Sequence, residues 1–396
     1  MRIVTLKIMN SGILLLPMIN KITVLGSGIM GHGIAQISAM NAYDVTLRDV
    51  EEKFLDNAMN KIRWSLDKLV EKNKIDKQQS DKIYGKIKPV VDLREALIDT
   101  DLLIEAVPED LNLKKKVYSE VDQFSQEKTI YSSNTSTLPI SEISQLSSRP
   151  DRFIGLHFFN PPQLMKLVEV IPGARTDKSI VDVGINFVKS LGKDPVLCNK
   201  DVPGFIVNRI FIPLVHEAAY CLESDGKSMT QIDSSVKFKM FLPMGLFELA
   251  DYTGLDVIHK ATVEMYSRDK TVVNPHPKIE HLFSSGKYGK KSGEGFYSYG
   301  DKNYERIPLS EEEAKQYDPI RILSVAINNA AWLISNNVCT KEDVELALKL
   351  GMGIKKELFE IGEVFGFEKI INTLNHLKER NGSFYAPDPY LKSISK

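Results

Sequence analysis

A glycine signature near the start of the chain restricts the fold more than any other feature. The sequence VLGSGIMGHG places Gly26, Gly28 and Gly31 directly after a β-rich run and at the start of a helical pattern. In such a strand–turn–helix unit Gly26 allows the tight turn and Gly28 lets the backbone approach a pyrophosphate, while Gly31 allows the helix to pack closely on the strand. A glycine-rich turn without a ligand is common, but this context predicts a dinucleotide-binding unit.

The residues around this signature indicate which dinucleotide binds. A helical pattern opens at Ile29 and Met30, so the helix N-terminus would present amide donors to a pyrophosphate. Asp49 ends the next β-rich run, where a carboxylate would accept hydrogen bonds from a ribose 2′-hydroxyl and repel a 2′-phosphate. NAD is therefore expected rather than NADP, and the neighbouring cation Arg48 is the one feature that would favour a phosphate.

Short β-rich runs alternate with amphipathic segments between residues 21 and 200. These runs are KITVLG (21–26), DVTLRD (44–49), TDLLIEAV (100–107), KTIYSSNTS (128–136), FIGLHFF (153–159), KLVEVI (166–171) and DPVLCN (194–199). The alternation predicts a Rossmann-type α/β domain with a largely parallel sheet and helices on both faces. Residues 51–86 exceed an ordinary crossover and predict a helical hairpin that projects from the sheet.

The pattern changes to long helices after Asp201 and then repeats. The matching pairs are EAAYCL (217–222) with NAAWLI (329–334), MG (244–245) with MG (352–353), and GLDVI (254–258) with GFEKI (366–370). This nearly constant register predicts a duplicated all-α unit. The expected domains are an extension (1–17), the α/β domain (18–200), a first helical domain (201–300) that ends in a glycine-rich stretch, and a degenerate second copy (301–396).

Charge balance and cysteine usage argue against several classes of partner. Lysine and arginine number 51 and aspartate and glutamate 52, so neither nucleic acid nor an anionic membrane is an expected partner. No apolar run approaches the length of a transmembrane helix. The three cysteines are distant in sequence and odd in number, which argues against a disulfide framework and a zinc site, so no metal is expected. We expect a protein of the reducing cytoplasm.

An ionisable pair, His157 and Glu169, lies in two apolar runs that otherwise predict buried strands. A lone histidine at a strand end is usually structural. A carboxylate on the adjacent strand would instead fix its tautomer and stabilise the imidazolium, as in a general base with an orienting partner. Pro161 and Pro162 predict the turn that would bring the two side chains together, and each could then satisfy the other in a buried setting.

Seven motifs in order give the chain its resemblance to a known family. They are GSGIMG, EAVPED (105–110), SSNTS (132–136), GLHFFNPP, LVEVI, PGFIVNR (203–209) and GKKSGEGFY (289–297). With them, residues 18–300 resemble the NAD-dependent L-3-hydroxyacyl-CoA dehydrogenases. The second helical copy and the ending RNGSFYAPDPYL (380–391) resemble the duplicated C-terminal unit of multifunctional β-oxidation enzymes.

This resemblance implies roles for individual residues. His157 would be the general base and Glu169 its orienting partner, while Ser136 and Asn208 would bind the substrate oxygen. The positions that match NAD contacts, besides the glycine loop with Ile29 and Met30, are Asp49, Glu109, Lys114, Ser136, Asn160 and Lys291. Ser65 and Lys72 in the hairpin match residues that hold coenzyme A, and Ser136 also belongs to that set. In the repeat Arg209 corresponds to Arg321 but Asn208 to Ile320, so the second copy is expected to be structural.

The expected activity is the NAD-dependent interconversion of (S)-3-hydroxyacyl-CoA and 3-oxoacyl-CoA, in fatty acid and acyl-CoA metabolism. One alternative is a dehydrogenase of a free hydroxy acid or sugar acid with the same base and carboxylate. Another is a non-catalytic NAD-binding protein, which would require none of His157, Glu169, Ser136 and Asn208. Single-domain relatives dimerise through the helical domain, so the chain is expected to be a monomer with an internal pseudo-dimer of helical units, or a homodimer.

Overall fold

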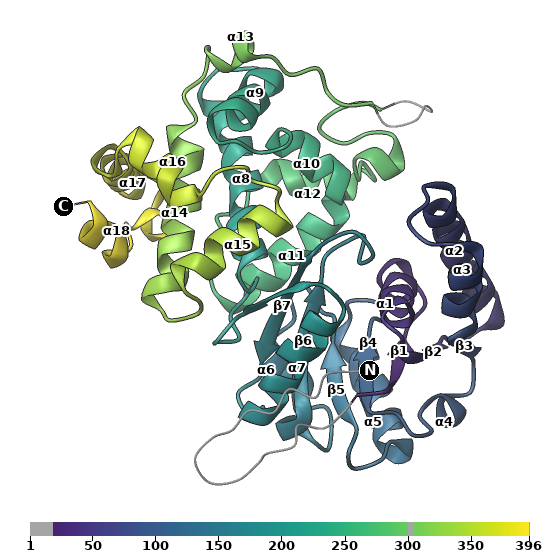
Figure 1. Ribbon diagram of the computed structural model, residues 1–396. Coiled ribbons are helices and arrows are strands. Elements are labelled where there is room, and N and C mark those ends of the chain that lie inside the picture. Colours follow the sequence, from purple (N-terminus) through teal and green to yellow (C-terminus); the bar gives the residue numbers. More distant parts are fainter. Residues whose placement is uncertain (1–18, 300–304, 396) are drawn as a thin grey trace. The chain divides into compact units, whose positions relative to one another are not determined.

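An eight-stranded sheet forms the first part of the computed structural model, which describes residues 19–299 and 305–395 (Figure 1). The strand order is β3-β2-β1-β4-β5-β6-β7-β8, for β1 (Lys21–Leu25), β2 (Asp44–Arg48), β3 (Ile87–Val90), β4 (Leu102–Glu105), β5 (Ile130–Ser133), β6 (Phe153–Phe158), β7 (Leu167–Pro172) and β8 (Asp194–Leu197). Neighbouring strands from β3 to β6 are parallel, and β7 is antiparallel to β6. The predicted Rossmann-type sheet is confirmed. The expected extension of residues 1–17 lies outside the described residues.

Helices pack on both faces of this sheet. They are α1 (Ile29–Met40), α2 (Glu52–Glu71), α3 (Lys77–Gly85), α4 (Leu93–Ala96), α5 (Leu111–Phe124), α6 (Ile140–Ser144) and α7 (Lys178–Ser190). A Cβ on Gly155 would lie 2.7 Å from the side chain of Ile140 in α6, whereas a Cβ on Gly184 in α7 would lie 2.9 Å from the side chain of Ile154. Because successive strand residues point to opposite faces, α6 and α7 cover opposite sides of β6. This explains why all six residues of β6 are buried.

The strand β3 is absent from the sequence prediction. It contains Pro89, which lacks an amide donor and therefore argues against a central strand. In the structure β3 is one of the two edge strands of the sheet, and among the described strands it pairs only with β2, so the missing donor breaks no ladder between two neighbours.

The predicted helical hairpin of residues 51–86 is formed by α2 and α3. Both helices contact α1 and β3. The side chains that α2 buries recur at helical spacing: Leu55, Ala58, Met59, Ile62 and Leu66. The opposite side of α2 carries mostly polar and charged residues.

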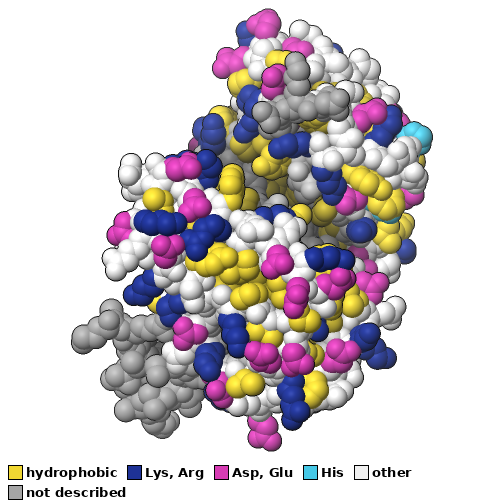
Figure 2. Space-filling model, turned by 90° about the vertical axis from the view of Figure 1, so that its right-hand side faces the viewer, with side chains coloured by type: hydrophobic (Ala, Val, Ile, Leu, Met, Phe, Trp, Pro, Cys, Tyr) yellow, Lys and Arg dark blue, Asp and Glu magenta, His cyan; other side chains and the backbone are white. Residues whose placement is uncertain are grey.

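On the face drawn in Figure 2, basic and acidic side chains are interspersed rather than gathered by sign, in agreement with the balanced composition.

The second part of the chain is helical and comprises, among the described residues, 136–139, 196–299 and 305–395. Its helices are α8 (Val207–Ser224), α9 (Met229–Lys239), α10 (Leu246–Thr253), α11 (Leu255–Arg268), α12 (Pro277–Ser284), α13 (Glu311–Ala314), α14 (Ile320–Ser335), α15 (Lys341–Gly351), α16 (Leu358–Phe365), α17 (Phe367–Asn381) and α18 (Pro389–Ile394). None of the described helices combines the length and the apolar character that a bilayer span requires. We propose residues 201–300 and 301–396 as the limits of the two helical copies.

The duplication is visible in how equivalent helices begin. Ser228 caps α9 and Thr340 caps α15, each in a capping box. Gly254 and Gly366 separate α10 from α11 and α16 from α17 with nearly the same backbone angles, φ 106° and ψ 120° against φ 90° and ψ 116°. These pairs share one offset in sequence, so the two helical series are copies of one unit.

The pairing of Met244–Gly245 with Met352–Gly353 is wrong. Gly245 caps the N-terminus of α10, whereas Gly353 follows the C-terminal end of α15 with φ +73°. The structural equivalent of Gly245 is Glu357, which caps α16. The two Met-Gly dipeptides match by chance, because their glycines occupy different structural positions. Gly245 lies at the start of a helix, and Gly353 lies in a left-handed turn after a helix.

Reciprocal arginine contacts join the two copies where α8 packs on α14. The guanidinium of Arg209 in α8 stacks on the ring of Trp332 in α14, with 3.3 Å between its central carbon and the ring centroid. Arg321 in α14 pairs with the buried carboxylate of Glu217 in α8 and donates to Ser224. Equivalent arginines thus bind opposite copies, which fixes the packing of one copy on the other.

A buried charge cluster lies within the sheet domain, where β4 ends and α5 covers it. Glu105 is fully buried, and its carboxylate accepts hydrogen bonds from the ammonium of Lys114 at 2.6 Å and from the hydroxyl of Ser133 at 2.7 Å. The Lys114 ammonium also lies 3.2 Å from Glu109. Burial by itself lowers the pKa of Lys114, but the two carboxylates outweigh it and raise the pKa. The Lys114 ammonium is therefore held in its charged form.

We predict that Lys114→Met lowers the free energy of unfolding by about 3–5 kcal/mol, because it leaves the Glu105 carboxylate buried without its counter-charge. Chemical denaturation of the full chain measures this loss. The matched control is Lys115→Met on the exposed side of α5, which should change stability by less than about 0.5 kcal/mol. Equal stability of the two variants would contradict the role of the ion pair.

Candidate active site

The glycine loop joins β1 to α1 and has the shape that a pyrophosphate requires. A Cβ on Gly31 would lie 1.7 Å from the carbonyl oxygen of Gly26, so a side chain is excluded there. At Gly28, by contrast, no described atom lies within 4 Å of the place a Cβ would take, and no side chain caps α1. The first amides of α1, at Ile29 and Met30, therefore have no capping side chain beside this open position. These residues fit the phosphates of NAD.

Asp49 follows the last residue of β2 and contacts the same loop. One carboxylate oxygen accepts hydrogen bonds from the amide and the hydroxyl of Ser27, both at 2.7 Å, and the other accepts from the amide of Val50 at 2.7 Å. A carboxylate has about four acceptor positions, so it can still accept from a ribose hydroxyl. Arg48, the cation that would favour NADP, donates to the carbonyl of Val91 at 3.1 Å. Its guanidinium is thus engaged with the backbone after β3.

His157 and Glu169 face each other across β6 and β7. The antiparallel register pairs the two residues directly, and Nδ1 of His157 lies 2.6 Å from Oε2 of Glu169. Glu169 is fully buried and His157 is 6% exposed. An ionised carboxylate only accepts hydrogen bonds, so Nδ1 carries the proton and Nε2 carries the lone pair of a base. The ring of Phe159 packs on the imidazole at 4.5 Å between centroids.

The topology of the sheet places His157 and Glu169 near the carboxyl ends of the parallel strands. β6 runs parallel to β5, β4 and β1, so His157, one residue before the end of β6, lies at the carboxyl edge of the sheet. The glycine loop follows β1 at the same edge. It lies next to the switch point between β1 and β4, where the order of strands along the sheet reverses. In open α/β sheets ligands bind at this edge.

Ser136 and Asn208 both belong to the helical unit. The amide nitrogen of Asn208, in the first turn of α8, donates to the backbone carbonyl of Ser136 at 3.1 Å. The turn before α8 is tight: Phe205 has φ +51°, and a Cβ on Gly204 would lie 2.5 Å from Met265. Non-glycine residues with such angles are uncommon and often occur at functional sites.

The remaining predicted cofactor residues have different surroundings. Glu109 accepts from the Thr135 hydroxyl at 2.6 Å, whereas Lys114 is buried between Glu105 and Glu109. Asn160 is exposed after β6. Lys291 belongs to the helical unit, where it pairs with Asp256.

The two predicted coenzyme A residues lie seven positions apart on α2, which puts them on one side of the helix. Ser65 is half-buried, and its hydroxyl accepts from the side-chain amide of Gln36 in α1 at 3.0 Å. Lys72 is exposed at the C-terminal end of the helix.

Sequence reasoning quoted Glu105 in a motif but gave it no role. The sequence contained a signal for it, because Glu105, like Glu169, is a charged residue within an apolar run. Within the described residues, no cluster of His, Cys, Asp and Glu could hold a metal ion.

Two family models together match most of the chain. The model described as "3-hydroxyacyl-CoA dehydrogenase, NAD binding domain" matches residues 21–202, and "3-hydroxyacyl-CoA dehydrogenase, C-terminal domain" matches residues 204–299.

Similar proteins are found among both curated and solved proteins. The mitochondrial hydroxyacyl-coenzyme A dehydrogenase of Sus scrofa is 40% identical over 290 residues, which are 71% of this chain and 92% of that protein. The 3-hydroxybutyryl-CoA dehydrogenase of Clostridioides difficile is 39% identical over 70% of this chain and 99% of that protein. The crystal structure of the Escherichia coli 3-hydroxybutyryl-CoA dehydrogenase superposes with a TM-score of 0.86 at 25% identity, over 96% of this chain and 98% of that one, and thus includes the second helical copy.

The matched domains, the identities and the shared architecture agree with one another. The chain belongs to the 3-hydroxyacyl-CoA dehydrogenase family and is an NAD-dependent oxidoreductase of fatty acid and acyl-CoA metabolism.

Proposed function

We propose that the protein interconverts (S)-3-hydroxyacyl-CoA and 3-oxoacyl-CoA with His157 as the general base. The observation that carries this proposal is the buried contact of 2.6 Å between His157 Nδ1 and Glu169 Oε2. Bound NAD would supply the hydride acceptor. Nε2 of His157 takes the hydroxyl proton of the substrate, and Glu169 stabilises the imidazolium that results.

Further residues are proposed to contact the substrate oxygen and NAD. Ser136 and Asn208 are proposed to hold the substrate oxygen, a role that rests on the family resemblance. The hydrogen bond between Asn208 and Ser136 supports this proposal, because the Ser136 carbonyl holds the two residues together and orients the Asn208 side chain. Glu109, Asn160 and Lys291 are proposed NAD contacts. We propose that Lys114 acts by orienting Glu109, because its own ammonium is buried.

An acyl-CoA is the substrate class that the family implies. We propose that its coenzyme A portion is held along α2 by Ser65 and Lys72. Lys61 and Lys68 lie on the same side of this helix, at spacings of four and three residues from Ser65. Three ammonium groups along one side would suit the phosphates of coenzyme A.

His157→Gln is expected to lower kcat for the reduction of acetoacetyl-CoA by NADH about 10² to 10⁴-fold. In this direction protonated His157 donates the proton to the substrate oxygen, and general acid–base assistance has about that size. Initial rates from NADH absorbance measure the loss. NADH affinity, measured by fluorescence titration, should remain unchanged.

A second variant and a second substrate make this test specific. Glu169→Gln keeps the shape of the partner but removes its charge, so it should also lower kcat. Free acetoacetate separates the proposal from the alternative of a hydroxy-acid dehydrogenase, since the wild type should strongly prefer the thioester. Wild-type rates in His157→Gln would refute the assignment of the base.

Asp49→Ala is expected to weaken NAD binding about tenfold or more and to reduce discrimination against NADP, because hydrogen bonds to a charged group contribute about 1.5–3 kcal/mol. Dissociation constants for both dinucleotides measure the change. Ser27→Ala is the control, because it removes a loop contact of Asp49 and leaves the carboxylate in place. Equal effects of the two variants would assign Asp49 to loop structure alone.

We infer that the second helical copy replaces a partner subunit, so that the protein is a monomer with an internal pseudo-dimer. The reciprocal contacts of Arg209 with Trp332 and of Arg321 with Glu217 support this inference. Light scattering of the purified chain should give the mass of one chain, 44.6 kDa. A stable dimer at micromolar concentration would contradict it.

A reducing compartment is proposed on the basis of the cysteines. Cys198, Cys221 and Cys339 are buried, and within the described residues none of them forms a disulfide bond. We propose the cytoplasm, which keeps such thiols reduced.

A further inference from the structure

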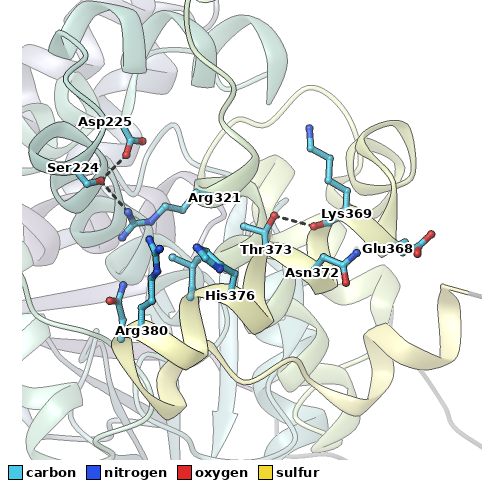
Figure 3. Close-up of a pocket in the computed structure, with 11 residues that line it drawn as sticks. Ser224, Asp225, Arg321, Glu368, Lys369, Asn372, Thr373, His376 and Arg380 are labelled. Carbon is cyan, nitrogen blue, oxygen red and sulfur yellow. Dashed lines mark hydrogen bonds between the residues drawn. The ribbon is translucent and has the colours of Figure 1, made fainter.

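A cavity of about 860 Å³ lies in the helical unit, where the end of α8 and the start of α14 meet one side of α17 (Figure 3). Ser224 comes from the first copy, whereas Arg321, His376 and Arg380 come from the second. In Figure 3 the two arginines and the histidine gather at one end of the cavity. None of these residues has a role in the dehydrogenase site proposed above.

In the first copy the equivalent arginines pair with carboxylates. There Arg268 in α11 pairs with Glu264 at 2.5 Å, and Arg209 lies 3.6 Å from Asp269. Both arginines of the first copy are therefore partly neutralised by acidic residues on or next to α11.

The second copy keeps the arginines and has lost these acids. Arg380 stands at the position of Arg268, but His376 replaces Glu264 and Asn381 replaces Asp269. Within the part of the chain that the structure describes, neither the Arg380 guanidinium nor the His376 ring has an ion-pair or hydrogen-bond partner. Arg321 is held in place by Glu217 and Ser224. Arg380 thus has no counterpart of the Glu264 carboxylate that pairs with Arg268, whereas Arg321 is balanced by Glu217.

Two carboxylates line the cavity, and within the described residues neither forms an ion pair with Arg380 or His376. Asp225 accepts hydrogen bonds from the hydroxyls of Ser224 at 2.6 Å and Tyr317 at 3.0 Å. Glu368 lies in the first turn of α17, about 18 Å along the helix axis from Arg380. Lys369 beside it pairs with Asp318 at 2.8 Å.

We propose that this cavity binds a phosphorylated small molecule, with its phosphate between Arg380, His376 and Arg321. Guanidinium groups match phosphate oxygens with paired donors, and an imidazole adds a further one. The volume suits a ligand of nucleotide size rather than a phosphate ion alone. Because the lining comes from both copies, occupancy would also stabilise their packing.

Calorimetric titration of the full chain, saturated with NAD, tests the proposal with inorganic pyrophosphate as the probe. His376→Glu restores the carboxylate of the first copy and should weaken binding about tenfold or more, as the loss of a charge-assisted contact predicts. Asn375→Glu introduces the same charge on an exposed neighbour outside the cavity and should leave binding nearly unchanged. A second pair, Arg380→Gln with Lys378→Gln as its control, should behave in the same way.

AMP in the same titration distinguishes the sources of the phosphate. Tighter binding of AMP than of pyrophosphate, lost in His376→Glu, assigns a nucleotide; the reverse order assigns a free phosphate compound. Absence of binding, binding unchanged in His376→Glu, or equal weakening by Asn375→Glu would overturn the proposal. Binding is measured without turnover, so the result does not depend on the proposed catalytic residues.

Discussion

A carboxylate that is buried inside a sheet must find a counter-charge or a set of hydrogen-bond donors, and this requirement organises the sheet domain. Glu169 and Glu105 are both fully buried, at β7 and at the end of β4. The first is satisfied by an imidazole and the second by an ammonium and a hydroxyl. Unpaired, each would destabilise the fold by several kcal/mol. The same physics that holds Glu105 in place also fixes the tautomer of His157, and with it the nitrogen that can act as a base.

The helical unit shows how a duplicated element takes on separate tasks. Arg209 and Arg321 occupy equivalent positions, but Arg209 stacks on Trp332 and Arg321 pairs with Glu217. The first copy has Asn208 beside its arginine, and the second has Ile320. The second copy therefore lacks the polar group expected at the substrate. It has His376 where the first copy has Glu264 and Asn381 where the first copy has Asp269, so Arg380 has no carboxylate partner among the described residues.

Much of the fold could be predicted because the relevant signals are local. The glycine loop, the alternation of β-rich and amphipathic runs, and the change to long helices after Asp201 each depend on residues that are close in sequence. The strand β3 was missed because Pro89 is typical of an edge strand, and only the completed sheet shows which strand lies at its edge. The pairing of Gly245 with Gly353 failed because a glycine can cap a helix start or follow a helix end, and letters alone do not distinguish the two.

The sequence by itself determined the family, the NAD-binding fold and the identity of the histidine–glutamate pair, because motif order and strand periodicity are written along the chain. Only the tertiary structure decided that Lys114 is a buried counter-ion, that Arg48 donates to a backbone carbonyl, and that Arg380 lacks the acid of its counterpart. Such roles depend on which charges meet after folding, and the distance between two side chains in space is not encoded in their separation along the sequence.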